Sequence, residues 1–254
     1  MTFRLQYPSD ANTNIRKDIY SHVTHRAGCR ISRRQHTLGW GLDGDDRNLR
    51  FSTLVCRELC AREVNLGITG TLIARAGLSR DNRSSFVDRV GGLEGCDYAV
   101  IFGGTNDYFW SDAPIYPPAD VSGEHIAGIA GDEYFITAAD TVVREAARLV
   151  GGIDRLLVLT PYRHHGTGNY KGGKHFRDSS AHPTDTENFN GFTISDYSEA
   201  LREVCRRHRA ACLDLDSLPF DWLTLTSDGC HPNPAGHRRL ARLVAERLGE
   251  IIKD

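Results

Sequence analysis

Asp228 and His231 lie three residues apart near the end of the chain, on a segment rich in glycine and proline. On a loop, this spacing lets the carboxylate bind one imidazole nitrogen while the other nitrogen faces a pocket. An imidazole oriented in this way is the base of a nucleophilic triad, because the carboxylate stabilises the imidazolium that forms during proton transfer. The alternative is a loop histidine that a neighbouring carboxylate merely satisfies.

The elements that would position this pair follow a repeated order of strand and helix. Nearly continuous apolar runs predict buried strands at 63–68, 97–102, 155–161 and 211–215. Apolar residues at helical spacing predict helices at 47–61, 136–150 and 194–209, and another from Pro234 onward. Such alternation is typical of a parallel sheet covered on both faces, whose active residues lie at the carboxyl ends of the strands.

The composition argues against nucleic-acid-binding, disulfide-rich and membrane-spanning proteins. The 254 residues include 31 lysines and arginines against 33 acidic residues, which gives no electrostatic footprint for nucleic acid or an anionic membrane. The seven cysteines form no Cys-x-x-Cys pair, so free thiols are expected rather than a disulfide framework or a zinc knuckle. The chain has no apolar run of transmembrane length and no signal pattern in residues 1–10, which predicts a soluble cytoplasmic protein. The alternative is an exported protein whose signal is hidden because the first residues are misread.

Two long polar loops, at about 107–130 and 161–193, are expected to form the walls of a site. The second loop contains four histidines, which raises the alternative of a metal site. Their spacing follows no zinc pattern, so we expect neither a metal nor an organic cofactor. The histidines concerned are His164, His165, His175 and His182.

Three ordered motifs resemble the sequence blocks of the SGNH or GDSL hydrolases, a family of esterases, lipases and deacetylases. Asn65-Leu66-Gly67-Ile68-Thr69-Gly70 is similar to the second block, and Gly104-Thr105-Asn106-Asp107 to the third. Asp228-Gly229-Cys230-His231 is similar to the fifth. The resemblance covers residues 37–254. It implies a three-layer α/β/α sandwich with a central, mainly parallel five-stranded sheet of flavodoxin-like type.

The resemblance also assigns roles to residues. Gly70, through its backbone N–H, and Asn106, through its side-chain amide, would form an oxyanion hole, where each donor can contribute about 3 kcal/mol. His231 would be the general base and Asp228 its orienter. Considered alone, Asn106 could be a polar turn residue and Gly70 a helix cap. Trp110 and Tyr108 could line a substrate pocket or simply pack the loop.

The nucleophile of this family is missing. Its first block, Gly-Asp-Ser-x-Thr-x-Gly, aligns so that Gln35 occupies the serine position, with Arg33 and Arg34 before it. Glutamine cannot attack a carbonyl. Ser32, His36, Thr37 and Cys230 are weighed as substitutes, and none has the required position and partner. The preceding strand, Cys29–Arg34, would carry three cations into a position buried on both faces.

We therefore hypothesise that residues up to about His36 are translated in the wrong reading frame. Arg33-Arg34-Gln35-His36 can be encoded CGG CGA CAG CAT, and a shift of one base gives GGC GAC AGC AT, which spells Gly-Asp-Ser and begins an isoleucine codon. In the same shifted frame, residues 29–32 permit Val-Val-Phe-Leu, a suitable buried strand. The rival hypothesis is a family member that lost its serine.

The sequence thus predicts a polar N-terminal segment at 1–27, read out of frame, and one hydrolase-like domain at 28–254. The activity that the family resemblance implies is hydrolysis of a carboxylic ester through an acyl-enzyme. The substrate would be a small-molecule ester or an acylated sugar, with no nucleic-acid or membrane partner. The alternative function is that of an inactive family member that binds a ligand or serves as a scaffold.

Overall fold

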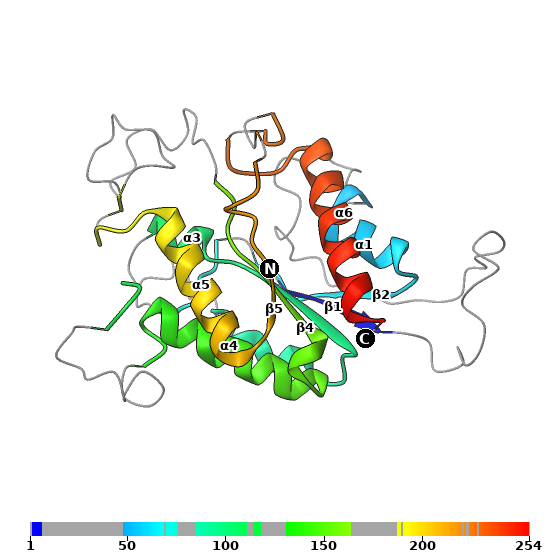
Figure 1. Cartoon of the computed structure of the whole chain (residues 1–254), viewed down its shortest axis with the longest axis horizontal. Helices are drawn as coiled ribbons and strands as arrows, with labels where there is room; N and C mark the ends of the chain where they lie inside the picture. Colours follow the sequence, from blue (N-terminus) through cyan, green and yellow to red (C-terminus); the bar gives the residue numbers. More distant parts are fainter. Residues whose placement is uncertain are drawn as a thin grey trace.

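The computed structural model describes the part of the chain that builds the sheet and its helices (Figure 1). For residues 2–6 and for Trp110, only the backbone is described. The described residues are 2–6, 48–68, 70–75, 85–110, 114–117, 131–163, 187–188, 190–219, 221, 224–227 and 229–253. None of the helices in these ranges is both long and apolar enough to cross a membrane.

A five-stranded sheet forms the centre of the molecule, with the strand order β2-β1-β3-β4-β5. Strands β3, β4 and β5 are parallel neighbours, and β1 is antiparallel to both β2 and β3. Four strands therefore run in one direction and β1 runs in the other. Their bounds are β1 Thr2–Gln6, β2 Arg62–Asn65, β3 Tyr98–Phe102, β4 Leu156–Leu159 and β5 Ala211–Leu213.

Strand β1 lies at the start of the segment 1–27, which was predicted only to be polar, without any strand. Thr2–Gln6 pair with β2 on one side and with β3 on the other, in the position that the predicted strand Cys29–Arg34 would have taken. Their sequence, Thr-Phe-Arg-Leu-Gln, alternates polar and apolar residues, which is a strand signal. Cys29–Arg34 lie outside the described residues, so the conformation of that segment stays a prediction.

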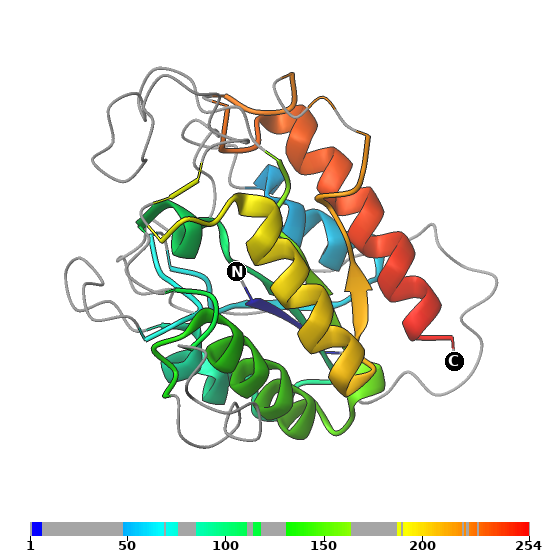
Figure 2. The same ribbon diagram turned by 60° about the vertical axis from the view of Figure 1, so that its left-hand side comes forward.

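Helices cover both faces of the sheet, as the predicted sandwich requires (Figures 1 and 2). Helices α1 and α6 pack on one face and bury Val100 of β3 with Leu157 and Leu159 of β4. The other face buries Ala99 and Ile101 of β3 under α4 and α5. Alternate residues of one strand thus enter two separate cores. The helices are α1 Phe51–Glu58, α4 Phe135–Val150, α5 Ile194–His208 and α6 Pro234–Ile251.

Three short helices complete the described part, and a further turn precedes β4. Helix α2, Phe86–Arg89, begins at a capping box in which Ser85 and Asp88 satisfy each other's backbone N–H groups. It continues into the 3-10 turn η3, Val90–Leu93, while α3, Thr105–Trp110, follows β3 directly. The turn η5, Ile153–Arg155, leads into β4. The apolar periodicity predicted none of these elements because each is too short to show one.

Candidate active site

The Gly70 turn, the described residues between 66 and 74, follows β2 and carries the later part of the second predicted block. Asn65 bends the chain at its start, because its Oδ1 accepts a hydrogen bond from the N–H of Gly67 at 2.9 Å. Gly70 itself has a φ of +72°, a conformation that side chains other than glycine rarely adopt. Glycine at this position therefore allows the backbone to turn where the predicted oxyanion donor lies.

The third block brings Asn106 against this turn. Gly104, at the end of β3, has a φ of +102°, and a Cβ there would lie only 2.9 Å from the Pro161 ring. This glycine lets the chain turn into α3 beside the end of β4. In the first turn of α3, Asn106 Nδ2 donates to the carbonyl oxygen of Thr71 at 3.1 Å. The two predicted oxyanion residues are thus held together, since Thr71 follows Gly70 directly.

Asp107 reinforces this contact from inside the protein. Its side chain is only 1% exposed and accepts hydrogen bonds at 3.0 Å from the N–H groups of Ile73 and Ala74. Burial raises the pKa of Asp107 to about 6, although these backbone donors favour the carboxylate. A buried carboxylate without donors would be costly, so Asp107 holds the Gly70 turn strongly against α3.

The segment after β4 connects these two blocks to the fifth. Pro161 lies against Gly104, and the next residue, Tyr162, donates a hydrogen bond from its hydroxyl to the carbonyl oxygen of Cys230. Both tyrosine and cysteine are buried. Cys230 directly precedes His231, so the third and fifth blocks lie on either side of the carboxyl end of β4.

The loop that carries His231 has a defined backbone. The N–H of Ser227 donates to the carbonyl oxygen of His231 at 2.8 Å, and Thr226 forms an isolated antiparallel bridge with Pro232. Asn233 then caps α6 by accepting from the N–H groups of Ala235 and Gly236, both at 3.0 Å. His231 is partly buried. This backbone fixes the place from which its imidazole would act.

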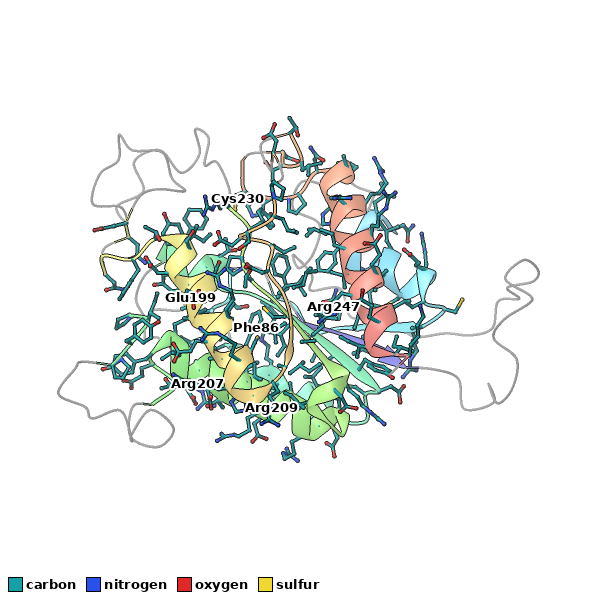
Figure 3. All side chains as sticks on the ribbon, in the orientation of Figure 1. Phe86, Glu199, Arg207, Arg209, Cys230 and Arg247 are labelled. Atoms are coloured by element: carbon teal, nitrogen blue, oxygen red, sulfur yellow. The ribbon has the colours of Figure 1, made fainter. Side chains whose placement is uncertain are left out.

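All three blocks lie beyond the carboxyl ends of the strands. Figure 3 shows Cys230 at one end of the molecule and Arg209, which precedes β5, at the opposite end. Asn106 follows the carboxyl end of β3, and the Gly70 turn follows that of β2. This is the edge where parallel α/β folds place their active residues. The structure therefore brings Gly70 and Asn106 together and places the His231 loop at the same edge.

Several predicted site residues lie outside this description. Asp228, Gln35, the side chain of Trp110 and the four histidines of the 161–193 loop are not among the described residues. Within the described ranges, no three histidine, cysteine, aspartate or glutamate side chains gather in a way that could hold a metal ion. Tyr108 is fully buried and packs edge-on against Tyr197. It therefore packs within the protein core and does not line an open pocket.

His237 was not predicted as a functional residue, but it ties the start of α6 to the start of α1. Its Nδ1 accepts a hydrogen bond from the N–H of Phe51 at 3.3 Å, and the two rings stack with centroids 6.4 Å apart. His237 is 5% exposed, and its Nε2 has no hydrogen-bond partner among the described residues. Burial, with a smaller contribution from Arg50, lowers the pKa of His237 to about 4.

This pKa predicts acid destabilisation. A histidine that titrates near 6.5 when unfolded and near 4 when folded binds its proton more readily in the unfolded chain. Its contribution is complete above pH 6.5 and is lost as the pH falls toward 4. Between pH 7.5 and pH 5 we expect a loss of about 2 kcal/mol in the free energy of unfolding. Urea unfolding of the present chain and of His237→Asn at both pH values measures this loss. The variant should lack this part of the pH dependence. Equal losses of unfolding free energy in the two proteins between pH 7.5 and pH 5 would contradict the prediction.

Comparison with known proteins agrees with this geometry. The model of the GDSL-like lipase/acylhydrolase family matches residues 36–239. A crystal structure of a chain 28% identical to this one has a TM-score of 0.63, over 84% of this chain and 92% of the other.

Two further neighbours share the fold at low identity. The aryl esterase of M. smegmatis is 16% identical, with a TM-score of 0.54 over 80% of this chain and 86% of its own. A carbohydrate acetylesterase from Sinorhizobium meliloti is 13% identical, with a TM-score of 0.52 over the same shares. A comparison with curated proteins found no match. Because the family model spans most of the chain and its motifs meet at one edge of the expected fold, the chain belongs to the GDSL-like lipase/acylhydrolase family.

Proposed function

We propose that this fold hydrolyses carboxylic esters through a serine acyl-enzyme, and that the present sequence has lost the serine block. The observation that carries the proposal is the contact between the Gly70 turn and Asn106, beside the loop of His231. Two donors from different blocks would face the oxygen that becomes negative in a tetrahedral intermediate. His231 would take the proton of the nucleophile and later give it to the leaving alcohol, while Asp228 orients its imidazole.

Position 35 is where the nucleophile would stand. Two observations support a frame error upstream of it. The family match begins at His36, directly after the positions where Gly-Asp-Ser is absent, and the central place in the sheet is taken by Thr2–Gln6 running antiparallel. A central strand of a parallel α/β sheet is normally parallel to its neighbours and apolar on both faces. Val-Val-Phe-Leu, the reading of residues 29–32 in the shifted frame, has that character.

The substrate class we propose is a small-molecule ester or an acylated sugar. Acyl transfer is the chemistry of the family, and one neighbour of the same fold is a carbohydrate acetylesterase. The loops that would select the acyl group and the alcohol are not among the described residues, and loop side chains rather than the fold set this choice.

The nucleotide sequence tests the frame error directly. If reading codons 29–37 one base along spells Gly-Asp-Ser at positions 33–35, the proposal holds. If no frame spells it, the frame error is excluded, and the rival hypothesis of a lost serine applies.

An organophosphonate ester tests the enzyme. The reference is a restored chain, in which residues 29–36 become Val-Val-Phe-Leu-Gly-Asp-Ser-Ile. Mass spectrometry should find the phosphonyl group on the serine at position 35 of the restored chain and no such label on the present chain. A folded restored chain that takes no label would instead support a protein that only binds a ligand.

Asn106→Ala in the restored chain is expected to lower kcat by roughly 10²- to 10³-fold, with little change in KM. The amide would bind the developing oxyanion more strongly than the ground-state carbonyl, so its loss affects the chemical step. Steady-state kinetics with a chromogenic acetyl ester measure both constants. The matched control is Asn48→Ala, because Asn48 is exposed and contacts only Arg57 among the contacts described. Equal effects of the two substitutions would contradict the role of Asn106.

A further inference from the structure

Arg89, the last residue of α2, directs its guanidinium at the Gly70 turn. Its Nη1 donates to the carbonyl oxygen of Leu66, and its Nη2 donates to Thr71 Oγ1 at 2.8 Å. Its Nε donates to the carbonyl oxygen of Ser85 at 3.1 Å. All three nitrogens of one side chain are therefore engaged, and two of them bind the turn at Leu66, four residues before Gly70, and at Thr71, the residue after it.

The charge of Arg89 is not used in an ion pair within the described ranges. Arg75 and Arg202, by contrast, each contact two or more carboxylates. The guanidinium of Arg89 instead lies over the ring of Phe86, with its carbon 5.1 Å from the ring centroid. Burial lowers the pKa of Arg89 to about 10, which leaves it charged at neutral pH. Its hydrogen-bond acceptors are neutral oxygens of Leu66, Thr71 and Ser85, and the nearby charge of Asp88 also favours the cation, so together they offset its desolvation.

The Gly70 turn is thus held from two sides. On one side, Asn106 and Asp107 of α3 bind Thr71, Ile73 and Ala74. On the other side, Arg89 binds Leu66 and Thr71, and the first N–H of α2 donates to the carbonyl oxygen of Leu72 at 3.0 Å. Thr71 takes part on both sides: its carbonyl receives Asn106 while its hydroxyl receives Arg89. The hydroxyl also donates to the carbonyl oxygen of Ile68 at 2.8 Å, which closes the turn around Gly70.

We propose that Arg89 is a positioning residue for the oxyanion hole, which fixes the direction of the Gly70 N–H relative to the amide of Asn106. The inference rests on the proposed function and deepens it. Arg89 touches neither the substrate nor the reacting atoms; it acts through Leu66 and Thr71. Electrostatic stabilisation of an oxyanion depends on donors that are already oriented, so a turn that samples several directions would slow the chemical step more than it weakens substrate binding.

Amide hydrogen exchange tests the positioning in the present chain, without any need for activity. In Arg89→Met, exchange in residues 66–75 should become at least about tenfold faster, with Ile73 and Ala74 as reporters. Arg89→Lys should give a smaller increase, because one ammonium cannot serve both Leu66 and Thr71 in the same geometry. Exchange in α5 should not change in either variant. The control is Arg155→Met, since Arg155 binds the backbone carbonyl of Val150 at the opposite edge of the sheet.

Kinetics of the restored chain test the consequence. Arg89→Met should lower kcat by roughly 10- to 100-fold with KM within about twofold, Arg89→Lys should recover part of that loss, and Arg155→Met should have no effect. Unchanged exchange at 66–75, an increase spread over the whole chain, or a loosened turn with full kcat would each overturn the proposal. A restored chain that is inactive with Arg89 intact would refute the proposed function instead, while the exchange measurement would still decide whether Arg89 positions the turn.

Discussion

The restored chain is expected to hydrolyse p-nitrophenyl acetate with a kcat roughly 10⁴- to 10⁶-fold above that of the present chain. In the proposed alignment, Gln35 of the present chain occupies the nucleophile position, and an amide side chain forms no acyl-enzyme. An oxyanion hole and a base without a nucleophile supply only a small part of the catalysis of such a site. The serine should therefore account for most of the rate.

The substitutions must also rebuild the strand before the serine. They are Cys29→Val, Arg30→Val, Ile31→Phe, Ser32→Leu, Arg33→Gly, Arg34→Asp, Gln35→Ser and His36→Ile. Removing three cations and making residues 29–32 a continuous apolar run should let this segment take the central place in the sheet, parallel to β3 and in place of Thr2–Gln6.

The control separates the effect of the serine hydroxyl from the effect of the rebuilt strand. It carries the same substitutions except that Gln35→Ala replaces Gln35→Ser, so it shares the rebuilt strand and lacks only the nucleophile. Initial rates and circular dichroism of the two chains decide the matter. If both are folded and hydrolyse the ester at the same rate, position 35 is not the site of the nucleophile.

Much of the fold could be predicted because buried strands and long helices leave strong local patterns. The four apolar runs became β2 to β5, each with shorter bounds than predicted: the run at 155–161, for example, became Leu156–Leu159. Strand β4 ends before the predicted run does, since Pro161 has no N–H to donate to a neighbouring strand and packs against Gly104 instead. The helix predicted at 136–150 was observed as Phe135–Val150, and it ends at Gly151 with a positive φ.

Short elements and the partner of β3 could not be predicted from periodicity. Thr2–Gln6 alternates over only five residues, a signal too brief to identify the strand that pairs with β2 and β3. Helix α2 has no amphipathic pattern, but the pair Ser85 and Asp88 has the spacing of a capping box and could have marked its start.

The residues of the proposed oxyanion hole and its surroundings divide in the same way. Gly70 and Asn106 were predicted from motifs, because a required backbone conformation or functional group restricts the residue type, and their role as donors stays a prediction. Arg89 was not predicted, since its contacts with the Gly70 turn are with residues 18 to 23 positions earlier in the chain. Asp107 was part of a motif, yet nothing in the sequence showed that its carboxylate would be buried and would receive the N–H groups of Ile73 and Ala74. Such contacts become visible only when the chain is folded.

His231→Ala in the restored chain is expected to lower kcat by roughly 10⁴- to 10⁶-fold, an effect comparable to loss of the serine itself. A serine hydroxyl is a weak nucleophile at neutral pH unless a base takes its proton as it attacks. The loop from Thr226 to Pro232 holds the backbone of His231 at the carboxyl edge of the sheet, beside Tyr162 and Cys230. Single-turnover and steady-state rates on p-nitrophenyl acetate measure the loss.

A double substitution separates a shared role from two independent effects. Residues that act as one unit are not additive, so His231→Ala combined with the alanine at position 35 should be no slower than either change alone. His208→Asn is the matched control, because His208 bonds to Asp140 at 2.7 Å at the end of α5, far from the carboxyl edge. If losses at positions 35 and 231 multiply, or if His208→Asn is as harmful as His231→Ala, then His231 is not the base that activates the serine.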